Sequence, residues 1–483
     1  MTPSMLGMLG RLALAAAPLA LAACAVGAPP PSVPAAVPAG WQAPLPHGAS
    51  VADLAHWWQR MDDPLLVELI AAAQEVSPSM AQARSRLAQA RASQVAARAA
   101  LWPALDAQAT ARRGLDTQQG GLNTVAQGTL QASWEVDLFG GNAAQDEAAA
   151  QRLAGARAQW HEARVSVAAE VALATSEWRQ CRQLQAVAQA DAQSRSETAR
   201  LARLSEQAGF TAPATAALAQ ASQAEGQARA VQQRLQCEVA LKGLVALTGW
   251  DEPVLRERLS ALPAQEAPDA LFAVSALPAQ VLAQRPDLYS AEREVAAASA
   301  EVGSARAQRY PRLVLSGTVG AGWLSMGGQQ QGANAWALGP ATLSLPLFDG
   351  GRRAAQVDAA QARYDEAVAL YRARVRQAVS EVEQALVRLQ GAAERSADAA
   401  RAAQGYHTAY LAAEARWRGG LASLMELEEV RRSALAAQTA VVNLRQERMA
   451  AWVALYRAAG GGWDADAPGP DAAPRPVAAR ATP

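Results

Sequence analysis

The feature that most constrains this sequence is an internal duplication, in which residues from about 64 to 249 recur at about 272 to 463, shifted by 208 to 211 positions. Five short segments match in the same order: 77–80 with 285–288, 99–103 with 307–311, 138–141 with 347–351, 208–210 with 419–421, and 245–247 with 453–455. Chance similarity in an alanine-rich chain does not keep five matches in register. We infer two copies of one supersecondary unit that build one architecture.

Composition narrows the class of protein. Lysine plus arginine equals aspartate plus glutamate at 44 residues each, so no net field draws the chain to nucleic acid. Aromatic residues make up only 5% of the chain, and alanine dominates. This balance favours long helices packed through small side chains over an enzyme with a bulky core.

The sequence contains no motif that is typical of an enzyme active site. The four histidines, His47, His56, His161 and His407, are far apart and lack metal-ligand spacing. A nucleophile elbow, a phosphate loop and a dinucleotide fingerprint are all missing from the sequence. We therefore expect no enzymatic activity, no metal site and no non-covalent cofactor.

The N-terminus predicts a lipoprotein. Residues 1–23 form a signal peptide in which Arg11 precedes an apolar stretch too short to span a bilayer. Small residues then lead to Cys24, where we expect diacylglycerol on the thiol and a further acyl chain on the new N-terminus. No aspartate follows this cysteine, which favours delivery to the bacterial outer membrane. Residues 24–50 are the expected Pro/Ala-rich tether, and residues 464–483 a disordered tail.

Four segments alternate between apolar and polar residues with period two, at about 104–113, 127–138, 312–324 and 335–347. A half-buried soluble sheet shows the same alternation, but a length of about 10 residues and the Gly-rich loop Gly327–Gly332 favour membrane strands. Trp134, Trp323 and Trp336 are candidate interface residues. Since about eight strands are the fewest that close a barrel, the chain must assemble. Two copies would provide eight strands and three copies twelve.

Each strand pair is followed by a long helical hairpin, at about 141–249 in the first repeat (51–250) and 351–458 in the second (272–463). The two repeats are joined by a linker at 251–271. Apolar residues recur at spacings of four and three from Tyr364 to Trp417, interrupted only by Ser396. This pattern is typical of a coiled coil, and a helix of this kind is roughly 100 Å long.

The hairpin predicts a disulfide. Cys181 and Cys237 lie at equal separations along the sequence before and after Gly209, so an antiparallel turn there brings them to the same height. In an oxidising periplasm these cysteines can bond. Two small buried core residues are the alternative.

Several motifs together resemble the TolC-like outer-membrane factors, and most closely their lipoprotein branch, labelled NodT. The motifs are Trp57-Trp58, Asp63-Pro64-Leu65, Arg285-Pro286-Asp287, Leu347-Phe348-Asp349-Gly350-Gly351, Arg418-Gly419-Gly420-Leu421 and Gly460-Gly461-Gly462-Trp463. The resemblance implies an α+β membrane protein: a homotrimer with one twelve-stranded outer-membrane barrel and a periplasmic tunnel of helical hairpins. It also implies docking to an inner-membrane pump, commonly of the resistance-nodulation-division (RND) type, directly or through a periplasmic adaptor (membrane fusion) protein.

The same resemblance assigns roles at the two hairpin turns. The turns, represented by Gly209, Phe210, Thr211, Gly419, Gly420 and Leu421, are similar to the adaptor-docking tips of the family, although glycine capping explains the glycines equally well. We also expect Thr211 to cap the helix that follows it.

The acidic gate positions of the family fall on Glu426 and Glu429. In a trimer each would form a ring of three carboxylates. The alternative is that Ser423 and Glu426 form a capping box. Glu428 departs from the usual leucine of the family.

The sequence thus predicts a passive exit duct of a tripartite efflux system, carrying small molecules such as drugs or toxic compounds. Two alternatives remain open at this stage. One is the outer-membrane duct of a type I protein secretion system, and the other is a structural envelope lipoprotein that does not conduct.

Overall fold

A computed structural model describes residues 27–35, 37, 41–43, 61, 63–116, 121–261, 282, 285–326 and 329–463. The expected signal peptide, Cys24 and the tail at 464–483 lie outside these residues. The chain forms two compact units. The first consists of Met1–Ala35, Ser85–Arg157 and Tyr289–Ala373, and the second of Ala36–Arg84, Ala158–Leu288 and Arg374–Pro483.

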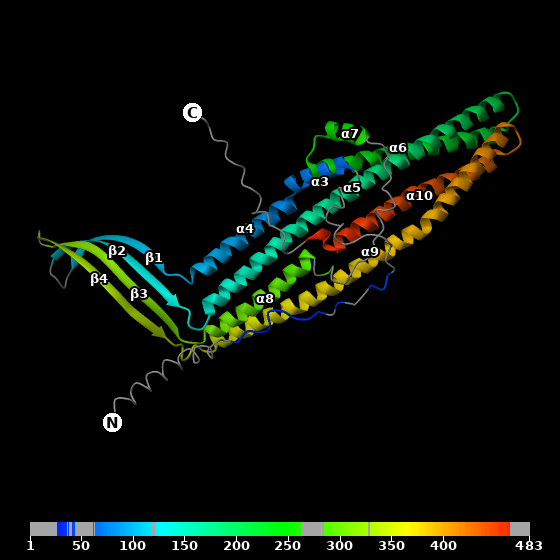
Figure 1. Cartoon of the computed structure of the whole chain (residues 1–483). Helices are drawn as coiled ribbons and strands as arrows, with labels where there is room; N and C mark the ends of the chain where they lie inside the picture. Colours follow the sequence, from blue (N-terminus) through cyan, green and yellow to red (C-terminus); the bar gives the residue numbers. More distant parts are fainter. Residues whose placement is uncertain are drawn as a thin grey trace, which may run out of the picture. The chain divides into compact units, whose positions relative to one another are not determined.

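The first unit contains one antiparallel sheet in the order β1-β2-β3-β4 (Figure 1). Its strands are β1 (Ala104–Asp116), β2 (Gly121–Val136), β3 (Arg312–Met326) and β4 (Gln329–Ser344). Each repeat provides one β-hairpin, and pairing of β2 with β3 joins the two. The outer strands β1 and β4 each have one edge that pairs with no other strand of the described chain.

Two of the four strands differ from the expected ranges in the same way. β2 and β4 begin at Gly121 and Gln329, six residues before the expected starts at 127 and 335, and both end earlier than expected. The expected loop Gly327–Gly332 is wrong for Gln329–Gly332, which pair with β3, while its first two residues lie outside the described residues. The stretch Gln329–Asn334 is mostly polar, so its propensity indicates a loop, but the backbone ladder with β3 extends the strand through it.

The helical part of the first unit packs around α8 (Pro286–Ala307) and the beginning of α9 (Arg352–Arg418). A buried cluster there consists of Val295, Ala298, Val302, Ala360, Tyr364 and Ala367. A second cluster joins α4 (Pro78–Ala99) to the beginning of α5 (Gly141–Gln207). No helix in the described part of the chain is both long and apolar enough to cross a membrane.

Part of the expected tether packs against the first unit. The carbonyl oxygens of Pro29 and Pro30 accept hydrogen bonds from Ser299 (2.5 Å) and Tyr364 (3.0 Å), and Val33 contacts the cluster around Val295. Pro29, Pro30 and Val33 of the expected tether are therefore in contact with the helices of this unit. The proline-rich backbone supplies unpaired carbonyl groups, and the hydroxyl groups of the helices satisfy them.

The second unit consists mainly of two helical hairpins that lie side by side (Figure 1). The later part of α5 returns as α6 (Pro213–Thr248), and the later part of α9 returns as α10 (Leu424–Ala458). The helix α3 (Pro64–Val76) begins after Asp63, whose carboxylate accepts the Leu66 N–H at 3.1 Å and a hydrogen bond from Arg179. Within the expected linker 251–271, residues Glu252–Ala261 form a helix, α7. A short 3₁₀ turn, Gly460–Gly462, follows α10.

The Arg285-Pro286-Asp287 motif joins three segments of the second unit. Arg285 donates to Asp287 (2.9 and 2.7 Å), to Glu381 of α9 (2.8 Å) and to the carbonyl oxygen of Ala458 at the end of α10 (2.9 Å). Burial alone would raise the pKa of Asp287, but the hydrogen bonds and charge of Arg285 hold that pKa below its usual range. The start of α8 is thereby fixed to α9 and α10.

The apolar seam expected along α9 is buried from Val375 to Ala392. Beyond Ala392, towards the end of α9, the seam is only partly covered by other helices, and Tyr406 is 47% exposed. The coiled-coil pattern therefore predicts correctly which residues of α9 are buried between Val375 and Ala392. In the later part of α9, some residues of the same seam stay exposed in a single chain.

Cys181 of α5 and Cys237 of α6 form a disulfide, with their Cα atoms 5.4 Å apart. The pairing is the one that the spacing around Gly209 indicates. It closes a loop between residues 56 positions apart, which includes the whole first turn.

Replacing both cysteines by serine should lower the free energy of unfolding by about 2–4 kcal/mol, because the unfolded chain regains the entropy that the closed loop removes. The loss can be measured by circular dichroism in increasing denaturant. A reducing agent should have the same effect on the native protein and none on the double variant. Equal stability of the oxidised protein and the double variant would contradict the prediction.

Candidate functional site at the hairpin turns

The two hairpin turns have the same backbone structure. After α5, Gly209 donates to the Glu206 carbonyl (2.9 Å) and Phe210 to that of Ser205 (2.8 Å). After α9, Gly420 donates to Trp417 (3.0 Å) and Leu421 to Arg416 (2.8 Å). Both patterns are Schellman motifs, which need a left-handed residue just beyond the end of the helix. Gly209 and Gly420 supply it, with φ of 77° and 72°.

The residue after each of these glycines is large, apolar and exposed. In a Schellman motif this residue usually packs back on the last helical turn. Phe210 is instead 87% exposed and Leu421 76% exposed. The same arrangement in both repeats gives the protein two apolar side chains that stand free on glycine-defined turns, as residues for contact with another protein do.

Thr211 has a different role from the expected one. The N-cap of α6 is Ala212, which makes no side-chain capping bond, and Pro213 occupies the first helical turn. The Thr211 hydroxyl instead shares a hydrogen bond with that of Ser205 at 2.6 Å. Thr211 therefore closes the turn across to α5, and proline at the helix start reduces the need for a cap.

The acidic residues after the second turn have local partners. Ser423 accepts the Glu426 N–H at 3.1 Å, which is one half of a capping box. The Glu426 carboxylate accepts from Arg416 at 2.6 Å, across the turn. Glu429 accepts from Arg432 at 2.6 Å, and both side chains are largely exposed. Within one chain, each of the two carboxylates is paired with an arginine, and the Ser423 cap satisfies the Glu426 N–H.

Glu428, between them, is partly buried in a polar network. Arg195 of α5 donates to Asp191 (2.9 Å), to Ser222 of α6 (2.6 Å) and to Glu428 of α10 (2.9 Å). The side chain of Arg195 is 3% exposed, that of Asp191 5% and that of Glu428 13%. Ser222 also donates to Glu428 at 3.0 Å.

Arg431 extends this network to the fourth helix. It donates to Glu428, to Ser194 (3.1 Å) and to Thr198 (2.9 Å). The hydroxyl of Tyr410, on α9, bonds Ser194 at 2.7 Å. The network therefore connects α5, α6, α9 and α10, two helices from each repeat.

A glycine on α6 makes room for the network. A Cβ atom at Gly226 would lie 2.7 Å from Cδ of Arg195 and 3.3 Å from Cα of Ala192. Any larger residue would displace the guanidinium. The small side chain is thus required for the close approach of α6 to α5 at this level.

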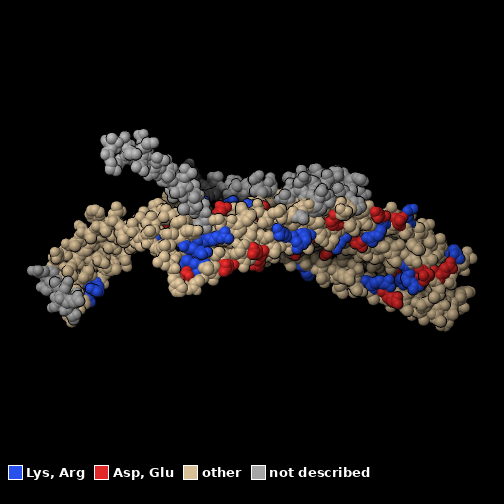
Figure 2. All heavy atoms as spheres, turned by 90° about the horizontal axis from the view of Figure 1, so that it is seen from below, with Lys and Arg blue, Asp and Glu red and all other residues tan. Residues whose placement is uncertain are grey.

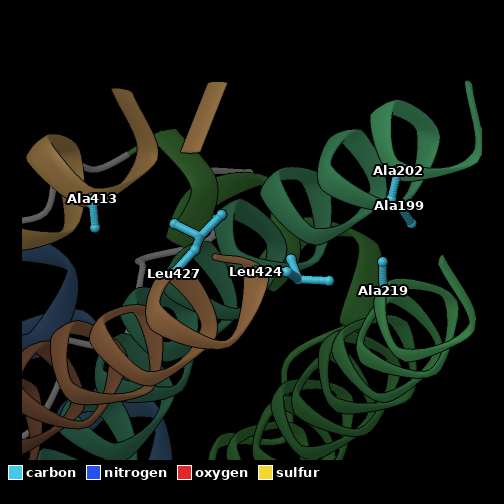
Figure 3. Packing of buried hydrophobic residues seen from close by; sticks show 6 residues of the cluster. All are labelled: Ala199, Ala202, Ala219, Ala413, Leu424 and Leu427. Atoms are coloured by element: carbon cyan, nitrogen blue, oxygen red, sulfur yellow. The ribbon is translucent and has the colours of Figure 1, made fainter. Parts of the chain in front are cut away.

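An apolar cluster lies next to the network (Figure 3). It is formed by Ala199, Ala202, Ala219, Ala413, Leu424 and Leu427, with Tyr410, Trp417 and Val430 against it. Small residues on α5 and α6 let the two leucines of α10 pack between the hairpins. The ends of both hairpins are therefore held by a polar layer and an apolar layer together.

Sequence reasoning identified Glu428 as unusual but did not find its partners. Arg195 and Arg431 lie in long runs of charged and alanine residues, and nothing in the sequence separates them from surface arginines. The spacing of Asp191 and Arg195 at i and i+4 is the one available signal, and many exposed pairs share it.

In the part of the chain that the structure describes, no group of three or more His, Cys, Asp or Glu side chains is placed to hold a metal ion. Figure 2 shows basic and acidic side chains interspersed over the visible face of the helices, in agreement with the zero net charge.

The sequence and the fold of this chain are similar to those of known outer-membrane proteins. The sequence profile for the outer membrane efflux protein family matches residues 69–250 and 277–461, one segment in each repeat. The chain is 31% identical to the outer membrane protein OprJ of Pseudomonas aeruginosa, covering 92% of this chain and 94% of OprJ. It is 30% identical to the pyoverdine export outer membrane protein OpmQ of Pseudomonas putida, covering 93% and 97%. The solved outer-membrane channel OprN, 28% identical, superposes with a TM-score of 0.79 over 89% of this chain and 99% of OprN.

The buried network predicts a difference between two arginines on α5. Replacing Arg195 by methionine should reduce the free energy of unfolding by about 3–5 kcal/mol, because Asp191 and Glu428 lose a buried partner. The same change at Arg200, whose bond to Glu197 is exposed, should cost no more than about 1 kcal/mol. Denaturant unfolding followed by circular dichroism measures both. Equal losses of stability in the two variants would contradict the prediction that the buried network stabilises the protein more than an exposed ion pair does.

Proposed function

Because the chain belongs to the outer membrane efflux protein family, we propose that it is the exit duct of a tripartite efflux system. It conducts small molecules, such as drugs or toxic compounds, from an inner-membrane pump to the exterior. Proteins of this family are channels and not enzymes, and they lie in the outer membrane and extend into the periplasm. The observation that carries the proposal is the presence, in one duplicated chain, of a four-stranded sheet with two unpaired edges and two long helical hairpins.

The unpaired edges of the sheet support assembly of three copies. In a bilayer, unpaired backbone groups of β1 and β4 would each cost several kcal/mol. Joining β4 of one copy to β1 of the next satisfies them, and three sheets provide the twelve strands of a single barrel. The helices of three copies then surround one continuous passage.

The exposed turns support docking of a periplasmic adaptor protein. Phe210 and Leu421 occupy equivalent positions in the two repeats, so a trimer presents six similar apolar sites. An adaptor with repeated binding elements could engage all six, which multiplies weak contacts. The pump is of the RND type in this proposal, and it supplies the energy because the sequence of the duct carries no phosphate loop for nucleotide hydrolysis.

We also propose that Glu426 and Glu429 form acidic rings at the entrance of the trimer. Three carboxylates at one level attract cations and repel one another. The Arg416–Glu426 bond, which crosses the second turn, reduces that repulsion in each chain. The same bond would connect the docking turn to the ring.

Cys24 is the proposed attachment site for the lipid anchor. Cells that express the protein with labelled palmitate should give a labelled protein, and the Cys24→Ser variant should give none, because the acyl chains have no thiol or processed N-terminus to occupy. The Cys237→Ser variant should keep its label. Label on the Cys24→Ser variant would contradict the assignment.

The proposed duct can be tested in cells by accumulation of dyes and antibiotics. Deletion of the gene should raise accumulation, and the native gene should restore it. The variants Phe210→Asp and Leu421→Asp, in which a charge replaces each exposed apolar contact, should fail to restore it although they reach the outer membrane. Val254→Asp, at an exposed position on α7, is the control and should restore it.

The culture medium is analysed in the same experiment for secreted proteins. Unchanged accumulation together with loss of a secreted protein would replace efflux by protein secretion. Unchanged accumulation, unchanged secretion and no conductance of the purified protein in a planar bilayer would instead identify a structural lipoprotein.

A further inference from the structure

The disulfide between Cys181 and Cys237 is closed to solvent in the folded chain. Cys181 is 8% exposed and Cys237 is 4% exposed. The side-chain amide of Gln233, one turn before Cys237, donates to the sulfur of Cys181 at 3.3 Å. Thiol–disulfide exchange needs direct access of the attacking thiolate to a sulfur atom, and the active site of another protein has no access to sulfur atoms buried in this way. A protein that oxidises these cysteines therefore has to act before the hairpin is completely packed.

Two elements that come later in the sequence cover the surroundings of the disulfide. Gln180, directly before the first of the two cysteines, donates to Asn443 of α10 at 3.0 Å. Glu238, directly after the second, accepts a hydrogen bond from Arg256 of α7 at 2.9 Å. Until α7 and α10 have packed, both cysteines lie on a hairpin with open sides. The packing of α10 therefore ends the period in which the two thiols are accessible.

Only the first hairpin has this bond. The helices α5 and α9 begin at Gly141 and Arg352 and have 67 residues each, so equivalent positions in the two hairpins differ by 211. The positions equivalent to the two cysteines hold Ala392 and Arg448, which cannot form a disulfide. A chain made and exported from its N-terminus brings out both cysteines before the second hairpin follows. The bond thus belongs to the hairpin that appears first, and the second hairpin is the one that covers it.

The time before α10 appears is short compared with uncatalysed disulfide chemistry. Roughly 190 residues separate Cys237 from the start of α10 at Leu424, and at a synthesis rate of about 5–20 residues per second α10 follows after about 10–40 s. Disulfide formation takes from seconds to hours, depending on the oxidant, and uncatalysed rearrangement takes minutes to hours. A bond that forms within this interval therefore needs an efficient oxidant.

We propose that this chain is a substrate of a thiol-oxidising protein of the periplasm, which forms the Cys181–Cys237 disulfide before α10 packs on α5. The thiolate of one cysteine attacks the disulfide of the oxidant, and a mixed disulfide forms as one sulfur of the oxidant leaves as a thiolate. The second cysteine of the chain attacks this mixed disulfide, which closes the hairpin and releases the oxidant as a dithiol. The chain loses two electrons and two protons, and the oxidant takes them up.

The oxidised hairpin then offers α10 a fixed surface. A covalent link at this level holds α5 and α6 in one register, because it removes arrangements in which the two helices are displaced along each other. Ser176 and Gln180 of α5 are then placed to donate to Gln446 and Asn443 of α10. The inference goes beyond the proposed duct. It requires only that the helices lie in the periplasm, which is an oxidising compartment.

The proposal can be tested by adding an oxidant before or after refolding. The full-length protein, with Cys24→Ser so that only the two hairpin thiols are counted, is reduced in denaturant and diluted into detergent. The probe is a periplasmic extract from which dialysis has removed small oxidants. Free thiols are counted by the gel shift that a maleimide-linked polymer produces. We expect extract that is present from the start to accelerate disulfide formation at least tenfold over buffer, and extract added after refolding to have no effect.

Two controls define the chemistry and the timing. An extract that has been reduced and alkylated, so that the cysteines of the oxidant are blocked, should not accelerate disulfide formation. The Val442→Asp/Leu444→Asp variant places charges at two buried positions of α10, so α10 packs poorly. The thiols of this variant should stay open to oxidation by extract that is added late.

Each unexpected outcome overturns a different part of the proposal. If extract that is present from the start gives no acceleration, the bond forms without a protein oxidant. Equal acceleration before and after refolding, with refolding verified by circular dichroism, contradicts the order of oxidation and packing. Acceleration by the alkylated extract contradicts thiol–disulfide exchange. None of these outcomes affects the proposed exit duct, because the assay counts thiols and does not measure transport.

Discussion

Helices as long as α5 and α9, each of 67 residues, depend in water on a partner along their length. Isolated helices gain little from propensity alone, and most of their stability comes from an apolar face that is covered. Here α5 and α9 have many alanines and few large apolar residues, so each contact buries little area and many contacts are needed. The hairpins α5–α6 and α9–α10 and the packing of α10 on α5 supply these contacts. Faces of α6 and α9 remain exposed in a single chain, including the apolar side chains of Leu235 and Val387.

The buried arginine network adds a different kind of constraint. Alanine-rich interfaces are smooth, and neighbouring helices could slide without a large loss of apolar contact. Arg195 and Arg431 bond groups on α5, α6 and α10, and a shift of one turn would leave buried charges without partners. This chain therefore places a polar layer that fixes the register of the helices close to the turns that carry Phe210 and Leu421.

Rigid turns and a sheet with open edges fit a conduit better than a catalyst. The Schellman motifs fix the two hairpin turns through backbone hydrogen bonds, so the side chains of Phe210 and Leu421 remain exposed. The sheet has edges that call for further copies, and the carboxylates of Glu426 and Glu429 stand beside the second turn. In the proposed assembly each of these features acquires its full role, because one unit is repeated first within the chain and then between chains.

The sequence by itself determined the duplication, the class of fold, the hairpins and the cysteine pair. Repeated segments, the periodicity of apolar residues and the spacing of the cysteines around Gly209 can all be read along the chain, without knowledge of tertiary contacts. It placed β2 and β4 too late, since their first residues are strands only through the ladder with β1 and β3. It placed the N-cap of α6 at Thr211, whereas the N-cap position is occupied by Ala212, which makes no side-chain capping bond. Only the tertiary structure decided which arginines are buried and which helix faces stay open. Those properties depend on contacts between residues far apart in the sequence, such as Arg195 with Glu428, and no local pattern encodes them.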